Sequence, residues 1–168
     1  MRRVALIGLC LALGGCGLHP LYSNGSHGVV AQTLAGVEVA PIEGKSGWLM
    51  TNALNDRLGR PTGSTATYRL DVKLDDKISG LGVRADDAVT RERRTLRARF
   101  QLVDLAKGTV LLDATAGSDA GIDVVGSEYA TIAAEDSALE NLSGIVADQI
   151  VARIALYAHR TQGAATAP

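Results

Sequence analysis

Apolar and polar positions repeat with two different periods along this chain, and each change of period marks a structural element. Residues 37–42 alternate as a short strand, and Pro41 near its end is typical of a sheet edge. After Ser46, which is the expected N-cap, the apolar positions recur every three or four residues, which predicts a helix that ends at Gly59. The expected apolar face of this helix consists of Trp48, Leu49, Ala53, Leu54 and Leu58.

The period falls to two after Thr65, which predicts a run of strands with one apolar face. Apolar residues alternate with charged residues at positions 68–75, and a region rich in Gly and Asp at 78–87 is expected to form a turn. The longest strand is expected at 89–104, a hairpin turn at 106–108 and a further strand at 109–116. Short connections between successive strands favour an antiparallel meander, which a looser segment at 117–126 would follow.

A long amphipathic helix is expected at residues 128–160, with Ser127 as its N-cap. Its predicted apolar face consists of Ile132, Leu139, Leu142, Val146, Ile150, Ile154 and Tyr157. The small and polar residues 161–168 are expected to be disordered. The element order predicts an α+β fold, a two-layer sandwich in which two helices cover one face of a mostly antiparallel four-stranded sheet.

The N-terminal pattern is typical of an export signal. Two arginines precede an apolar run at residues 4–13, which is shorter than the roughly 20 apolar residues that span a bilayer. The sequence Leu13-Gly14-Gly15-Cys16 resembles the bacterial lipobox, which makes Cys16 the first, lipidated residue of the mature chain. The alternative is a soluble secreted protein cut elsewhere, near Ala12. The expected organisation is a signal peptide at 1–15, a lipidated tether at 16–36 and one domain at 37–160.

The charge of the mature chain argues against nucleic-acid binding, and its cysteine content argues against a disulfide. Removal of residues 1–15 takes away two arginines and changes the formal net charge from −1 to −3, which does not suit a nucleic-acid-binding protein. Cys10, the other cysteine, leaves with the signal peptide, so no disulfide is expected.

Candidate catalytic and metal-binding residues are scarce. His19 and His27 lie in the tether without other ligands at suitable spacing, so no metal site is expected. The carboxylate pairs at 75–76 and 86–87 are expected in turns, where Asp is favoured for local hydrogen bonds. The glycines at 80–82 do not open a helix, as a phosphate-binding loop would. The sequence therefore predicts a protein that is not an enzyme and that has no cofactor.

An arginine ladder stands above this background. Arg91, Arg93, Arg97 and Arg99 step along one face of the longest predicted strand, where same-face neighbours are about 7 Å apart. Two interpretations stay open. In the first, Asp71 and Asp75 of the neighbouring strand and solvent neutralise the ladder. In the second, the ladder binds a phosphorylated or acidic partner, because guanidinium groups bind phosphate in a bidentate manner.

The two ends of the chain resemble the LptE family of lipopolysaccharide-assembly lipoproteins. After Cys16, the residues Leu18-His19-Pro20-Leu21-Tyr22 are similar to the family's CGFRPLY-type start. Further similar stretches are Ser127-Glu128-Tyr129-Ala130, Ala134-Glu135-Asp136, Ala138-Leu139 and Ala147-Asp148-Gln149-Ile150. The predicted element order also resembles the family fold.

This resemblance implies a lipoprotein of the cell outer membrane that faces the periplasm and is attached through its lipid anchor. It further implies a plug inside the β-barrel LptD that helps to assemble lipopolysaccharide into the outer leaflet. Whether the protein binds lipopolysaccharide directly stays open. The alternative is a free-standing periplasmic lipoprotein that binds a small amphiphile or peptidoglycan. A hydrolase would need a histidine-centred site that the sequence does not offer.

Overall fold

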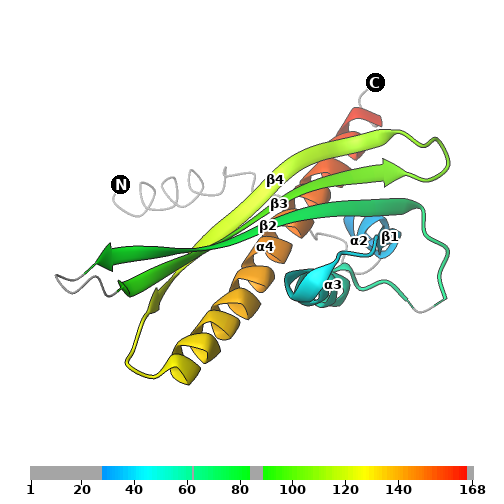
Figure 1. Cartoon of the computed structure of the whole chain (residues 1–168). Coiled ribbons are helices and arrows are strands. Elements are labelled where there is room, and N and C mark those ends of the chain that lie inside the picture. Colours follow the sequence, from blue (N-terminus) through cyan, green and yellow to red (C-terminus); the bar gives the residue numbers. More distant parts are fainter. Residues whose placement is uncertain (1–27, 62, 84–88, 166–168) are drawn as a thin grey trace, which may run out of the picture.

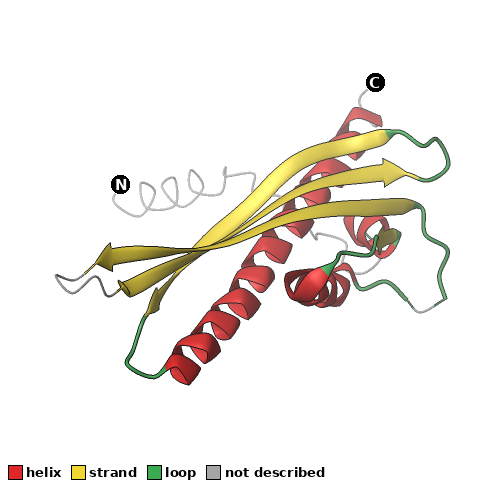
Figure 2. Cartoon of the chain, viewed as in Figure 1, coloured by secondary structure: helices red, strands yellow, loops and turns green. Residues whose placement is uncertain are grey.

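Four strands form one open sheet, and the helices lie on one of its faces (Figures 1 and 2). The computed structural model describes residues 28–61, 63–83 and 89–165. The elements in chain order are α2 (Val29–Ala35), β1 (Val37–Val39), α3 (Gly44–Leu58), β2 (Tyr68–Val83), β3 (Val89–Asp104), β4 (Val110–Asp123) and α4 (Glu128–Ala165). The spatial order of the strands is β1-β2-β3-β4, so the sheet follows the order of the chain. The expected α+β fold with helices on a single face is confirmed.

The sheet is mostly antiparallel, as its turn chemistry predicts. β2, β3 and β4 form an antiparallel meander, whereas β1 pairs in parallel with the first three residues of β2 at the sheet edge. Because β1 is so short, most of β2 pairs with only one neighbouring strand among the described residues. Figure 1 shows that the β2–β3 hairpin extends well beyond the helices, with α4 running diagonally beneath the sheet.

The core lies between the sheet and the helices. Alternate side chains of β2 and β3, among them Leu70, Leu96 and Phe100, are fully buried in one core with side chains of the helices. α4 contributes Leu139, Leu142, Val146, Ile150 and Ile154, which recur at helical spacing. Burial of each such side chain contributes roughly 1.5–3 kcal/mol. One apolar core therefore fixes which sheet face is covered and which is left to solvent.

The first long helix differs from its prediction at its start and on its exposed face. The N-cap of α3 is Glu43, three residues before the expected cap Ser46, and the helix runs from Gly44 to Leu58. Gly59 follows as the C-cap in the left-handed conformation. Trp48, expected on the apolar face, is 64% exposed. Leu54 and Leu58 are buried as expected, and Gly47 and Met50 are buried with them. Gly47 is needed because a Cβ there would lie 2.4 Å from the carbonyl oxygen of Ile42.

Helix α4 confirms its predicted cap and most of its apolar face. The hydroxyl of Ser127 accepts a hydrogen bond from the N–H of Ala130 at 3.5 Å. Ile132 is the exception, because it is 50% exposed on a first stretch of the helix that the sheet does not cover. The helix also continues through residues 161–165, which were expected to be disordered.

Two strands are longer than their patterns indicate. β2 runs to Val83 through the expected turn, so Asp75 and Asp76 lie within a strand and not in a turn. β4 runs to Asp123 through the segment that was expected to be loose. The inner positions Ala116, Ala120 and Ile122 continue the alternation there, although the interspersed glycines and serine weaken the hydrophobic signal.

The segment expected as a tether contains a helix. α2 packs against α4 and buries Val30 and Leu34, so the folded unit begins before residue 37. Cys16, His19 and His27 lie outside the described residues, and so does the carboxylate pair at 86–87. Within the described part of the chain, no helix is long and apolar enough to cross a membrane.

Candidate functional site

The uncovered face of the sheet carries the arginine ladder. Arg91, Arg93, Arg97 and Arg99 alternate along β3 with the buried Leu96, Ala98 and Phe100, so their side chains point away from the helices. No described helix covers this side of the sheet (Figures 1 and 2). The structure therefore places all four arginines on one exposed face, as their spacing predicts.

Aspartates of β4 neutralise three of the four arginines. Arg91 pairs with Asp123 at 3.0 Å, Arg97 with Asp119 at 3.3 Å, and Arg99 with Asp113 at 2.9 Å, measured between nitrogen and oxygen. The expected partners were on the wrong strand, because Asp71 pairs with Arg69 and Asp75 pairs with Lys77. The signal that could have found the true partners is that positions 113, 119 and 123 share one parity and hence one strand face.

The polar contacts of these aspartates shift their titration. The Arg99 guanidinium and, to a smaller extent, the Gln101 amide donate hydrogen bonds to Asp113, which lowers the pKa of its carboxyl to about 2. The pKa of Asp119 is also lowered, first by a hydrogen bond from the Thr95 hydroxyl and then by Arg97. Both carboxylates are therefore ionised throughout the physiological pH range.

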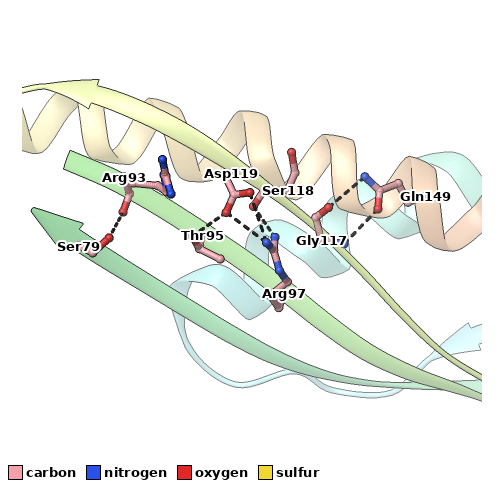
Figure 3. A network of polar contacts seen from close by, with 8 residues as sticks. All are labelled: Ser79, Arg93, Thr95, Arg97, Gly117, Ser118, Asp119 and Gln149. Carbon is pink, nitrogen blue, oxygen red and sulfur yellow. Dashed lines mark hydrogen bonds and ion pairs between the residues drawn. The ribbon is translucent and has the colours of Figure 1, made fainter. Parts of the chain in front are cut away.

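Arg97 is fixed in place by a glycine on the neighbouring strand. Its side chain lies across Gly117, where a Cβ would be 2.4 Å from the Cδ of Arg97. Its guanidinium donates to the Ser118 carbonyl at 3.1 Å as well as to Asp119 (Figure 3). Both terminal nitrogens of this half-exposed arginine already bond to acceptors of β4, so Arg97 is held in position and is a poorer candidate for a new ligand.

Arg93 has no such partner. Within the described residues its guanidinium makes no hydrogen bond or ion pair, and only its backbone carbonyl accepts a 3.5 Å hydrogen bond from Ser79 (Figure 3). The residue opposite on β4 is Gly121, beside which a Cβ would meet no atom within 4 Å. Arg93 lines an open hollow of about 370 Å³ together with Leu81, Arg91, Glu92, Asp119, Ala120 and Gly121.

A second unpaired cation, Lys73, was missed by the sequence argument. It lies on the same face of β2, opposite Arg99, and makes no ion pair among the described residues. A shallow hollow of about 480 Å³ is lined by Lys73, Leu74, Asp75, Arg97, Ala98, Arg99 and Thr115. Lys73 and Arg93 are thus the two cations of this face that form no ion pair among the described residues. We call this face the cationic face and define it by Lys73, Arg91, Arg93, Arg97 and Arg99.

A further arginine of the same run points the other way. Arg94 lies on the helix side of β3, where it pairs with Asp76 at 2.6 Å and donates to the backbone carbonyl of Glu135 in α4 at 2.9 Å. Both side chains of the pair are largely buried, with 11% and 19% of their surface exposed. The hydrogen bonds that Arg94 donates to Asp76 are the main cause that raises the pKa of Arg94. This pair fastens the β2–β3 hairpin to α4 and takes no part in the cationic face.

Among the described residues, no group of three or more His, Cys, Asp or Glu side chains could hold a metal ion. The model of the family LptE, described as lipopolysaccharide-assembly, matches residues 34–154, which is most of the chain. The chain belongs to the LptE family. The resemblance seen at the two ends of the sequence is thereby confirmed over the domain itself. No curated protein sequence matches the chain at a significant level.

Solved structures agree with this assignment to the LptE family. A lipoprotein from Caulobacter crescentus CB15 is 26% identical and superposes with a TM-score of 0.68, over 80% of this chain and 98% of the other. The minor lipoprotein from Acinetobacter baumannii is 15% identical, with a TM-score of 0.54, over 71% of this chain and 88% of the other. Rare lipoprotein B from Shewanella oneidensis is 12% identical, with a TM-score of 0.54, over 75% of this chain and 96% of the other. The last two show the fold alone.

Proposed function

We propose that this LptE-family protein is an outer-membrane lipoprotein that plugs the LptD β-barrel and helps to deliver lipopolysaccharide to the outer leaflet. In this proposal Cys16 carries the lipid anchor, the domain faces the periplasm, and the protein has no catalytic role. The observation that carries the proposal is the cationic face of an LptE-family domain, which no described helix covers and where two cations form no ion pair with the described residues.

The chemistry of the cationic face supports binding of phosphate groups. A guanidinium without an internal partner can donate two parallel hydrogen bonds to a phosphate, and an ammonium adds a point charge. Lys73 pairs in register with Arg99, which is six residues from Arg93 along β3, so the two free cations are about 20 Å apart. The ion-paired arginines between them keep the surface polar. Such a face suits a hydrated barrel lumen, in which acidic side chains or lipid phosphates supply the missing negative charge.

The barrel partnership is tested by purification of the tagged, full-length lipoprotein from detergent-solubilised outer membranes, with mass spectrometry of the eluted proteins. We expect a large β-barrel at near-equal stoichiometry. If the protein elutes without a barrel, the plug role is wrong. A bound amphiphile or peptidoglycan fragment in that sample would instead support a free-standing periplasmic binder.

The role of the free cations is tested with charge reversal. Arg93→Glu and Lys73→Glu should each weaken lipopolysaccharide binding or barrel recovery by about 10-fold, since a lost phosphate contact becomes a repulsion. Lys107→Glu is the matched control, because Lys107 is an exposed cation of the β3–β4 turn and does not belong to the cationic face. Equal behaviour of all three variants would show that the cationic face binds neither partner.

The anchor is tested with Cys16→Ala. The precursor of this variant should stay unprocessed and should not incorporate radiolabelled palmitate, because the acylated thiol is missing. Normal lipid labelling of the variant would remove Cys16 from the proposal.

A further inference from the structure

The outer edge of the sheet adjoins a groove that the cationic face does not include. β4 is the last strand in the sheet order, so one of its edges has no neighbouring strand among the described residues. Beside that edge, β4 and the second half of α4 enclose an open groove of about 300 Å³. It is lined by Leu112, Ala114, Arg153, Leu156, Tyr157 and Arg160.

The backbone of β4 shows which of its groups face the free edge. The Gly117 N–H donates to the side-chain oxygen of Gln149 at 3.1 Å, and the Gln149 amide donates back to the Gly117 carbonyl at 3.3 Å (Figure 3). Gln149 therefore occupies the place that a neighbouring strand would take. Because edge-facing residues alternate, the N–H and C=O groups of Thr115 and Asp113 point to the same edge. No described backbone group outside the sheet bonds to them.

Charge complements this free backbone. Arg153 and Arg160 line the groove, and neither forms an ion pair or a side-chain hydrogen bond within the described part of the chain. They are seven residues apart on one helix, which places their Cα atoms about 10 Å apart along the axis. Leu156, with 42% of its surface exposed, lies between them. The groove thus presents an apolar centre with a positive charge at each end.

We propose that an extended, acidic segment of a partner protein adds to the edge of β4 at residues 111–116, next to Gln149. Its backbone pairs with Thr115 and Asp113, one apolar side chain packs on Leu156, and carboxylates two residues before and after it reach the arginines. Same-face side chains of such a strand are about 7 Å apart, which matches an acidic-apolar-acidic pattern at alternate positions. This inference does not rest on the barrel partnership, because it concerns a different surface.

A second copy of this chain is a poorer occupant. Two β4 edges related by a two-fold axis would bring Arg153 and Arg160 of both copies toward each other, which adds positive charge to positive charge. The free backbone also favours a polypeptide over a lipid, since strand addition uses main-chain hydrogen bonds that an acyl chain does not make.

The test uses the full-length protein in neutral detergent and a fluorescent peptide, Thr-Glu-Thr-Leu-Thr-Glu-Thr. We expect saturable binding by fluorescence anisotropy and slower amide hydrogen exchange at Thr115. The double variant Arg153→Glu, Arg160→Glu should bind at least 10-fold more weakly, whereas Lys77→Glu, on β2, should bind as the unmodified protein does. A peptide that is N-methylated at alternate amides should lose binding, because it lacks the donors for the strand edge.

Three results would overturn the inference. The first is peptide binding that leaves hydrogen exchange at Thr115 unchanged, and the second is equal binding of a peptide with Lys in place of Glu. The third is concentration-dependent dimerisation, measured by light scattering, that the double variant abolishes while no peptide binds. Recovery of a barrel from membranes is unaffected by any of these results, so failure here is distinct from failure of the proposed function.

Discussion

At the scale of single residues, the cationic face combines arginines that form ion pairs with cations that form none among the described residues. Arg97 and Arg99 each have an aspartate on β4, and Arg97 is also pressed against Gly117. Arg93 and Lys73 have none among the described residues. Exposed ion pairs of this type contribute little to stability, typically under 1 kcal/mol each. Their main effect is to hold the side chains in place and to leave two charges for an external partner.

The pKa of the Asp113 carboxyl should lie well below that of an ordinary aspartate. Its pKa of about 2 means that the contact with Arg99 is fully present above pH 4 and is lost as pH falls through about 2. A pH titration of the side-chain carbon signal by NMR should show a midpoint near 2. In Arg99→Gln the midpoint should rise toward the ordinary value. An unchanged midpoint in that variant would show that Arg99 is not the cause.

Gly47 should be intolerant of any side chain. A Cβ there would lie 2.4 Å from the Ile42 carbonyl oxygen, and that backbone atom cannot move without displacing α3. We expect Gly47→Ala to lower the free energy of unfolding by about 1–3 kcal/mol in urea denaturation. The control is Gly121→Ala, because a Cβ at Gly121 meets nothing within 4 Å. Equal stability of the two variants would contradict the close packing of α3 on the preceding loop.

At the scale of elements, hydrophobic period predicted the type and order of most helices and strands but not all their ends. The alternation of Leu96, Ala98 and Phe100 is strong because that strand is buried on one face only. The strand predicted at 109–116 is shorter than β4 because glycines such as Gly117 and Gly121 are typical of turns. In the structure Gly117 lies within the strand, where the side chain of Arg97 leaves no room for a Cβ. α2 was missed because two buried residues, Val30 and Leu34, give too short a pattern to reveal a helix that depends on packing against α4.

The candidate site was predicted in the same uneven way. Parity along one strand is enough to place Arg91, Arg93, Arg97 and Arg99 on one face. Their partners depend on strand register, which the sequence left open, so Asp113 and Asp119 were missed in favour of acids on β2.

The Arg94–Asp76 pair, which fastens the β2–β3 hairpin to α4 and which we call the clamp, should cost more unfolding free energy to break than any exposed ion pair. Arg94 and Asp76 are largely buried, and loss of one partner leaves a buried charge without compensation. We expect Arg94→Met to lower the free energy of unfolding by roughly 2–4 kcal/mol and to speed hydrogen exchange in the first turns of α4. Lys77→Met removes the exposed pair with Asp75 and should change stability by less than about 1 kcal/mol. A clamp variant as stable as this control would contradict the clamp.

At the scale of the whole molecule, the fold separates its surfaces. The helices cover one face of the sheet, and no described helix covers the cationic face on the other side. The groove beside the outer edge of β4 is a third, separate surface. In the plug role proposed above, the protein would meet its surroundings on several sides at once. Under the two proposals made above, separate surfaces would bind lipopolysaccharide or a barrel wall on the cationic face and an extended segment at the β4 edge.

The most direct test is photocrosslinking in living cells from a benzoylphenylalanine placed at Thr95, between Arg93 and Arg97 on the cationic face. The same probe at Trp48, an exposed residue of α3 on the helix side, is the control. From position 95 we predict ultraviolet-dependent adducts with lipopolysaccharide and with a β-barrel. From position 48 we predict no adduct with lipopolysaccharide. An absence of both adducts at position 95, from a protein that is expressed and folded, would contradict the account.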